Sequence, residues 1–309
     1  MTNKNENKEK EFSKVSINWY PGHMVKTKRQ IMEDLKLIDV VVELLDARIP
    51  LASQNPSIKE IISGKKKIIA LNKCDFADEK ENKKWVQYFK ENGITAVLTD
   101  SNSGNGISNL VREIERTVKE EMKLEAEKGR VGKNIRVLVL GIPNVGKSSL
   151  INRLAKKTPA KVGNKPGVTK QKQWIKVEDN IELLDTPGVL WPKFESQDVA
   201  LKLAYTGTIK DDLLEKIEVA YYLIKFLLEN YKKNVIERYK LNENEIDNIL
   251  NNENQAENEN IYEIIQIIGK KRGAIISGGN IDDEKVANIL LEDFRSGKLG
   301  KISLEKAGI

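Results

Sequence analysis

The stretch Gly141-Ile142-Pro143-Asn144-Val145-Gly146-Lys147-Ser148-Ser149 has the residue types and spacing of a phosphate-binding loop, G-x-x-x-x-G-K-[ST]. An apolar, strand-like run (residues 135–140) precedes it and a helix-like run (residues 149–155) follows. A glycine-rich turn in that position directs backbone N–H groups at one point. Lys147 can reach the β- and γ-phosphates of a nucleotide, and the Ser148 hydroxyl can bind Mg²⁺. We expect phosphate contacts from this loop and one later glycine: Asn144, Val145, Gly146, Lys147, Ser148, Ser149 and Gly188.

A second motif, Asn72-Lys73-Cys74-Asp75, fits N-K-x-D and follows a strand-like run. The Asp75 carboxylate can accept hydrogen bonds from N1 and the amino group of guanine, whereas adenine would leave it buried and unpaired. The stem of Lys73 can cover the face of the base. Asp100-Ser101-Asn102 can close the pocket through backbone N–H groups, with a plain loop as the alternative. The expected guanine-binding residues are Asn72, Lys73, Asp75, Asp100 and Ser101.

A third motif, Asp185-Thr186-Pro187-Gly188, fits D-x-x-G. Its carboxylate would hold Mg²⁺ through water, and the Gly188 N–H would contact the γ-phosphate. Thr169 is a further candidate ligand, from a loop that the triphosphate would order; the alternative is a solvent-facing threonine. The expected metal-binding residues are Ser148, Thr169 and Asp185.

The residue that would orient the attacking water is less obvious. Ras-like enzymes place a glutamine after D-x-x-G, and this chain has Val189 there. His23 is the only histidine, and an imidazole titrates in the range that suits orienting or deprotonating water. The alternative is a helix-entry residue in a turn anchored by Trp19 and Tyr20.

Six short apolar runs at residues 39–45, 67–71, 95–98, 135–140, 174–177 and 181–184 alternate with helical patterns. This order predicts a mostly parallel sheet with helices on both faces. Ligands bind such sheets at the carboxyl ends of the strands, so the motifs should converge there. From about residue 196 only helical periodicity remains, which predicts a separate all-α domain. Residues 242–260 are rich in Asn and Glu, and we expect a loop around one short helix.

The composition of the chain narrows the class of protein to which it can belong. The 309 residues carry a formal net charge of +6, which is compatible with a polyanionic partner. Cys74 is the only cysteine, which excludes an intramolecular disulfide and a Cys-rich zinc site and fits a reducing cytosol. No apolar run reaches the length of a membrane span. The polar first residues do not resemble a signal peptide, and we expect a disordered leader over residues 1–14.

The motifs are those of GTPases in an altered order, because N-K-x-D precedes the phosphate loop. The chain therefore resembles the circularly permuted GTPases of the TRAFAC class. Within that class it resembles the ribosome biogenesis GTPase A family. The resemblance rests on Trp19-Tyr20-Pro21-Gly22-His23-Met24, Asp46-Ala47-Arg48-Ile49-Pro50, the phosphate loop, and Asp293-Phe294-Arg295-Ser296-Gly297-Lys298-Leu299-Gly300.

The resemblance implies a circularly permuted P-loop GTPase domain over residues 15–200 and a small all-α, RNA-binding domain over residues 201–309. It implies a cytoplasmic GTPase that binds GTP and GDP with Mg²⁺ and assists late assembly of the large ribosomal subunit. Binding to the precursor in the GTP state and release after particle-stimulated hydrolysis are expected, with His23 contributing to hydrolysis. Asn144 matches an asparagine linked in this class to K⁺, and we expect a monomer.

Basic residues near helix ends are the candidates for binding ribosomal RNA, since they can contact phosphates. Such residues are also favourable at helix C-termini for electrostatic reasons alone, so a solvated face is the alternative. The candidates are Lys270, Lys271, Arg272, Arg295 and Lys298.

Two other functions stay open. The chain can be a P-loop ATPase or small-molecule kinase, which Asp75 disfavours. It can also be a nucleotide-binding RNA scaffold without significant turnover, which hydrolysis measurements with ribosomal particles would distinguish.

Overall fold

The computed structural model describes residues 29, 31–62, 64–129, 132–155, 174–178, 180–184 and 196–308. His23, Thr169, Asp185, Gly188 and the expected leader lie outside the described residues, so their roles stay predictions.

The described residues form two compact units. One contains the sheet and also residues 206–209 and 297–308. The other contains residues 196–205 and 210–296 and is helical. The sequence placed the whole chain after residue 200 in the helical domain. The structure differs for the tail segment, residues 297–308, because these residues make their hydrogen bonds to loops of the sheet unit.

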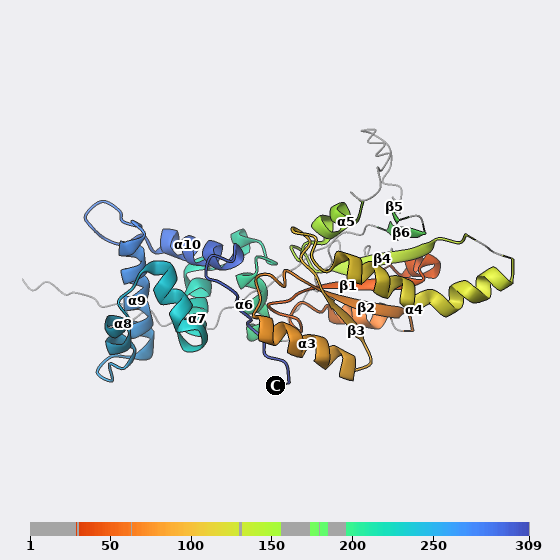
Figure 1. The fold of residues 1–309 in the computed structure, drawn as a ribbon. Coiled ribbons are helices and arrows are strands. Elements are labelled where there is room, and N and C mark those ends of the chain that lie inside the picture. Colours follow the sequence, from red (N-terminus) through yellow and green to blue (C-terminus); the bar gives the residue numbers. More distant parts are fainter. Residues whose placement is uncertain are drawn as a thin grey trace, which may run out of the picture. The chain divides into compact units, whose positions relative to one another are not determined.

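The sheet has six strands in the order β3-β2-β1-β4-β6-β5 (Figure 1). All neighbours are parallel except β5 and β6, which form an antiparallel pair. The strands are β1 (Val40–Asp46), β2 (Lys66–Asn72), β3 (Thr95–Leu98), β4 (Ile135–Gly141), β5 (Trp174–Glu178) and β6 (Ile181–Leu184).

The order of the strands shows how the motifs can be permuted. The chain passes outward through β1, β2 and β3 and then crosses back to β4, which lies between β1 and β6. The strand that precedes the phosphate loop is therefore central in space, although it comes fourth in sequence. Changing where such a chain begins leaves every strand with the same neighbours, because only loops are cut and rejoined.

Helices cover the sheet and bury its strands. All seven residues of β1 are buried, which is typical of a parallel sheet covered on both faces. Trp85 and Phe89 of α3 pack against Ile69 and Leu71 of β2. The helical segments of this unit are η1 (Leu35–Leu37), α2 (Pro56–Ile61), α3 (Glu79–Glu91), α4 (Ile107–Glu127) and α5 (Lys147–Ala155).

The helical unit buries its own apolar core. Val219, Leu223 and Leu227 of α7 are fully buried, as are Ile264 and Ile268 of α9. The helices are α6 (Gln197–Tyr205), η2 (Asp211–Leu213), α7 (Lys216–Tyr239), α8 (Glu243–Leu250), α9 (Glu257–Lys271) and α10 (Asp283–Arg295) (Figure 1).

The Asn/Glu-rich stretch is more helical than the sequence suggested. Asn242 caps α8, because its side chain accepts a hydrogen bond from the Glu245 backbone N–H. The stretch also contains the start of α9, whose first turn carries Glu257 and Glu259. Acidic residues are favourable in the first turn of a helix, which explains why so polar a segment folds this way. Within the described residues, no helix is long and apolar enough to cross a membrane.

Candidate functional site

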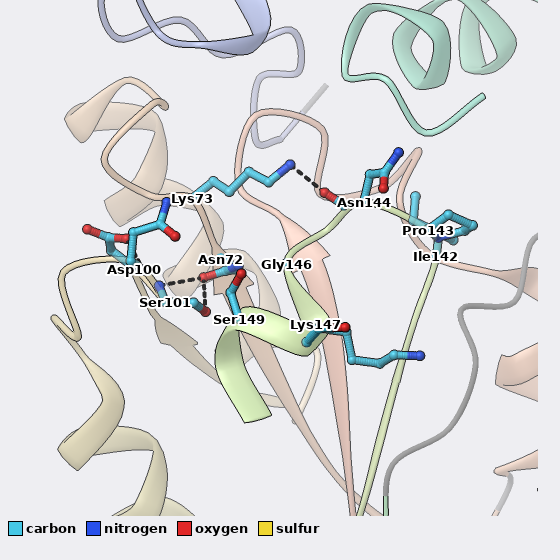
Figure 2. A pocket seen from close by; sticks show the side chains of 12 residues that line it. Asn72, Lys73, Asp100, Ser101, Ile142, Pro143, Asn144, Gly146, Lys147 and Ser149 are labelled. Atoms are coloured by element: carbon cyan, nitrogen blue, oxygen red, sulfur yellow. Dashed lines mark hydrogen bonds between the residues drawn. The ribbon is translucent and has the colours of Figure 1, made fainter. Parts of the chain in front are cut away.

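The carboxyl ends of β2, β3 and β4 bring the start of the guanine motif and the phosphate loop to one pocket of ≈ 620 Å³, a size that suits a nucleotide (Figure 2). Of the expected nucleotide-binding residues that the structure describes, Asp75 and Val145 do not line this pocket. Asn72 ends β2 and Gly141 ends β4. These strands are parallel and flank β1, so they deliver the guanine motif and the phosphate loop to the same edge of the sheet. The lining residues are Asn72, Lys73, Asp100, Ser101, Asn102, Ile142, Pro143, Asn144, Gly146, Lys147, Ser148 and Ser149.

The phosphate loop depends on glycine where the backbone turns into α5. Gly146 has φ +94°, and a Cβ there would lie 2.3 Å from Asn72 Nδ2. Lys147 is the first residue of α5, so the loop places the N-terminal N–H groups of a helix at the pocket. These groups and the helix dipole favour a bound anion. The loop is thus shaped to hold phosphate groups.

Asn72 joins the guanine motif to the phosphate loop. Its Nδ2 donates a hydrogen bond to the Val145 carbonyl oxygen at 2.7 Å. Its Oδ1 accepts hydrogen bonds from the Ser101 N–H at 3.1 Å and the Ser101 hydroxyl at 2.8 Å (Figure 2). The same oxygen accepts from the Thr99 hydroxyl at 3.3 Å. The side chain is 2 % exposed, so these bonds are shielded from water. One amide therefore fixes three loops relative to one another.

Lys73 also bridges two segments of the pocket. Its backbone has φ 59°, and its Nζ donates to the Asn144 carbonyl oxygen at 2.6 Å (Figure 2). The same Nζ lies 3.2 Å from Asp46 Oδ2. Burial lowers the pKa of Lys73 below its usual value, and the nearby charge of Asp46 opposes that shift. The two contacts direct the lysine stem along the pocket.

Asp75 and Asp100 form an acidic pair in which each carboxyl has a different environment. Burial and then the charge of Asp100 raise the pKa of Asp75 above its usual value. Burial also acts to raise the pKa of Asp100, but hydrogen bonds from Ser103 and Asn102 outweigh it and leave that pKa lowered. Asp100 is therefore the carboxylate that stays ionised more readily.

The loop that begins at Asp100 lines the pocket differently from the expectation. The sequence suggested that its backbone N–H groups close the pocket around the base. In the structure the Asp100 N–H donates to Asn105 O at 2.9 Å, and the Ser101 N–H donates to Asn72. The Asn102 N–H donates to Asp100 Oδ1 at 2.8 Å. These donors stabilise the loop itself, because a tight turn must satisfy its own buried N–H groups.

Asn144, the candidate K⁺ ligand, lies on the exposed side of the phosphate loop. It has φ 63°, and its Nδ2 donates to the Gly207 carbonyl oxygen at 2.5 Å. Gly207 belongs to residues 206–209, which fold with the sheet unit. Of the expected Mg²⁺ ligands only Ser148 is described. Its exposed side chain lines the pocket, and a hydroxyl oxygen is a donor that Mg²⁺ accepts.

The basic residues expected to contact RNA divide into two groups. Lys270 and Lys271 are exposed at the C-terminal end of α9, and Lys298 is exposed in the tail segment. Arg295 instead donates to the Tyr205 and Ala204 carbonyl oxygens and makes a two-pronged contact with Asp211. Arg272 donates to Asp293 at 3.2 Å and lies over the Tyr239 ring. The two arginines stabilise the helical unit, a use that charge and helix position alone did not reveal.

The sequence placed Asp46 at a strand end near the other motifs, but it did not predict the ion pairs of Asp46 with Arg48 and Lys73. Arg48 donates from its backbone N–H and Nε to Asp46 Oδ1, at 3.0 and 2.9 Å, and from a terminal nitrogen to Oδ2 at 2.8 Å. Both residues are 1 % exposed. Burial alone would raise the pKa of Asp46, but the charges of Arg48 and Lys73 hold that pKa well below its usual range. The available signal was an arginine two residues after an aspartate that ends an apolar strand.

Known proteins resemble this chain over most of its length. A family model described as 50S ribosome-binding GTPase matches residues 136–268. Ribosome biogenesis GTPase A of Bacillus cereus is 48% identical over 289 residues, which cover 94% of this chain and 93% of that protein. The chain belongs to the ribosome biogenesis GTPase A family. Mitochondrial ribosome-associated GTPase 1 of Mus musculus is 33% identical, over 93% of this chain and 90% of that protein.

Solved structures support the same assignment to the ribosome biogenesis GTPase A family. GNP-bound YlqF from T. maritima covers 92% of this chain and 99% of its own, with a TM-score of 0.61 and 29% identity. The GDP-bound form of YlqF has a TM-score of 0.64 and 28% identity, and covers 90% of this chain and 99% of its own. These findings confirm the circularly permuted GTPase fold, guanine-nucleotide binding and GTP hydrolysis that the sequence predicted, for a protein of ribosome biogenesis.

Proposed function

We propose that this GTPase is a switch in late assembly of the bacterial large ribosomal subunit. It binds the subunit precursor when loaded with GTP and leaves after hydrolysis that the particle stimulates. The observation that carries the proposal is the pocket in which Asn72 ties the N-K-x-D motif to the phosphate loop. Because hydrolysis removes the γ-phosphate, contacts made to it are lost and a bound partner can be released.

In this proposal the described residues bind and orient the nucleotide. Asp75 accepts hydrogen bonds from guanine, with Asn72, Lys73, Asp100 and Ser101 shaping that part of the pocket. Lys147 and the N–H groups from Asn144 to Ser149 hold the phosphates, and Gly188 adds a contact from outside the described residues. Ser148, Thr169 and Asp185 would hold Mg²⁺, which, when bound, neutralises charge on the β- and γ-phosphate oxygens.

Hydrolysis forms a bond between water and the γ-phosphorus and breaks the bond from that phosphorus to the β–γ bridging oxygen, giving GDP and inorganic phosphate. We assign His23 the role of orienting that water, since the side chain of Val189 has no hydrogen-bonding group. Asn144 would bring K⁺ to the phosphates. Intrinsic turnover should then be slow, because the site is completed on the particle.

Binding of ribosomal RNA falls to the helical unit in this proposal. Lys270 and Lys271 at the end of α9 are exposed and carry the positive charge that phosphates attract. Lys298, in the tail segment of the sheet unit, is a separate exposed candidate, while Arg272 and Arg295 hold the helices of the helical unit together. The protein would act as a monomer in the cytoplasm, with an RNA-binding domain that begins after about residue 200.

Co-sedimentation with immature large subunits tests the proposal. The protein should pellet with the particles in a non-hydrolysable GTP analogue and stay in the supernatant with GDP. Mature small subunits are the control. Equal pelleting in both nucleotides would instead favour the scaffold without significant turnover.

A further inference from the structure

A chain of contacts reaches from residues 302–305 to the nucleotide pocket. It runs from the tail segment through Arg48 and Asp46 to Lys73, and it involves only residues of the sheet unit. The contacts join positions more than two hundred residues apart in sequence, as between Leu51 and Glu305 (|i−j| = 254). Such contacts form only in the folded chain, and each one restricts a loop at the edge that holds the pocket.

The pocket end of this chain is the Lys73 ammonium group. Its acceptors are the Asn144 carbonyl oxygen at 2.6 Å and Asp46 Oδ2 at 3.2 Å. The Lys73 side chain is 19% exposed, so water satisfies little of its charge. Removing the Asp46 charge would weaken the electrostatic attraction that holds the Lys73 side chain in this orientation, because a largely buried ammonium group needs a nearby anion.

Asp46 is itself held in one orientation. Arg48 contacts both carboxylate oxygens, and the planar guanidinium fixes the plane of the carboxylate. Oδ2 is thereby presented to Lys73. Because Asp46 and Arg48 are each 1 % exposed, neither side chain can turn without leaving a buried charge unpaired.

The tail segment holds the loop that carries Arg48. The Leu304 N–H donates to the Arg48 carbonyl oxygen at 2.9 Å. The Glu305 carboxylate accepts hydrogen bonds from the N–H groups of Leu51 at 2.6 Å and Ala52 at 3.1 Å. These acceptors satisfy backbone donors directly after the Asp46–Pro50 loop, so Glu305 caps the turn that presents Arg48.

The tail segment also contacts the loop after Lys73. The Ile302 N–H donates to the Phe76 carbonyl oxygen at 2.9 Å, and the Ser303 hydroxyl accepts from the Asp78 N–H at 3.1 Å. The Arg48 guanidinium lies 5.7 Å from the centre of the Phe76 ring. The segment therefore links the loop that follows Asp46, the last residue of β1, to the loop that begins with Lys73 after β2.

We propose that Asp46 is a positioning residue for Lys73, and that residues 302–305 of the tail segment hold Arg48 and Asp46 in the geometry that makes the pocket bind nucleotide tightly. The inference rests on the proposed place of Lys73 in the nucleotide site. In this proposal, guanine-nucleotide affinity depends on the tail segment, independently of any ribosomal partner.

The test is a double-mutant cycle on the full-length protein, read by the affinity for a fluorescent GDP. Asp46→Asn and Lys73→Met should each weaken binding roughly tenfold, the effect of losing one charged hydrogen bond. In the Lys73→Met background, Asp46→Asn should change affinity less than about twofold, because its target is gone. If the affinity loss of the double variant equals the product of the two single losses, Asp46 acts independently of Lys73, and the inference is overturned.

Glu305→Gln is the second variant, since it changes the tail segment without placing an unpaired charge in the core. It should weaken GDP binding severalfold in wild type and have little effect beside Lys73→Met. Lys301→Ala is the matched control in the same segment, because Lys301 forms an exposed ion pair with Glu79. Its GDP affinity should equal that of wild type.

If Glu305→Gln binds GDP as Lys301→Ala does, the role of the tail segment is wrong. If Lys73→Met itself binds GDP as well as wild type, the assignment of Lys73 to the nucleotide site fails, and the inference fails with it. If Lys73→Met weakens binding and the cycle is additive, only the inference is overturned.

Discussion

Asn72 Nδ2 and the Val145 carbonyl oxygen lie 2.7 Å apart, and this hydrogen bond joins the guanine motif to the phosphate loop. The two residues come from β2 and from the turn after β4, strands that are separated in the sheet by β1. Base recognition and phosphate binding are thus linked through one buried amide. A nucleotide that occupies both halves of the pocket benefits from that fixed spacing.

Asn72→Ala should lower both stability and nucleotide affinity. It leaves the Val145 carbonyl oxygen and the Ser101 N–H without their partner, and an unsatisfied buried group costs about 1–3 kcal/mol. We expect a fall in the free energy of unfolding of that size and at least a tenfold loss in GTP affinity, measured by denaturant unfolding and calorimetry. Asn92→Ala, an exposed asparagine at the end of α3, is the control and should match wild type in GTP affinity.

Gly146→Ala should abolish nucleotide binding. The new Cβ would lie 2.3 Å from Asn72 Nδ2, so either the phosphate loop or the Asn72 amide must move. Gly93→Ala is the matched control, because Gly93 also has positive φ (+72°) but its Cβ would meet nothing within 4 Å. It should cost about 1–2 kcal/mol of stability from backbone strain and leave GTP affinity intact. Retained GTP binding by Gly146→Ala would contradict the assigned packing.

The phosphate-loop glycine shows what the sequence could establish. Gly146 was assigned from the motif alone, and the strands that surround it were assigned from apolar runs bounded by turn residues. The link from Asn72 to Val145 joins positions 73 residues apart (|i−j| = 73), so local pattern could not supply it. The tail segment escaped prediction for the same reason, since its hydrogen bonds depend on distant loops. Arg295 carries the charge expected of an RNA ligand, and only the structure shows Asp211 beside it.

As pH is lowered, GTP affinity should begin to fall at a higher pH than it would if Asp75 had the usual pKa of an aspartate. Guanine needs ionised Asp75, so binding is complete above the pKa of that carboxyl and is lost as pH falls through it. Burial and the charge of Asp100 raise this pKa above the usual value of an aspartate. Asp100→Asn removes the neighbouring charge and should move the midpoint of the pH profile to lower pH. An unchanged midpoint, measured by fluorescence titration of a GTP analogue, would argue against the coupling of the two carboxyls.

Arg295→Lys should destabilise the helical unit without touching the pocket. Lysine keeps the charge but loses the fork that contacts Asp211 and the carbonyl oxygens of Ala204 and Tyr205. We expect a loss of about 2 kcal/mol in the free energy of unfolding, with GTP affinity unchanged.

The double variant Lys270→Glu with Lys271→Glu should instead weaken particle binding and the salt dependence of that binding, while the free energy of unfolding stays within about 0.5 kcal/mol of wild type. Thermal unfolding and co-sedimentation separate the two cases.

The most direct test of the central claim is single-turnover GTP hydrolysis by wild type and His23→Ala, each with and without immature large subunits. We predict strong stimulation of wild type by the particles. His23→Ala should bind GTP with normal affinity and respond little to the particles, because orientation of the water is lost. No stimulation of wild type by the particles would contradict the proposed switch in large-subunit assembly.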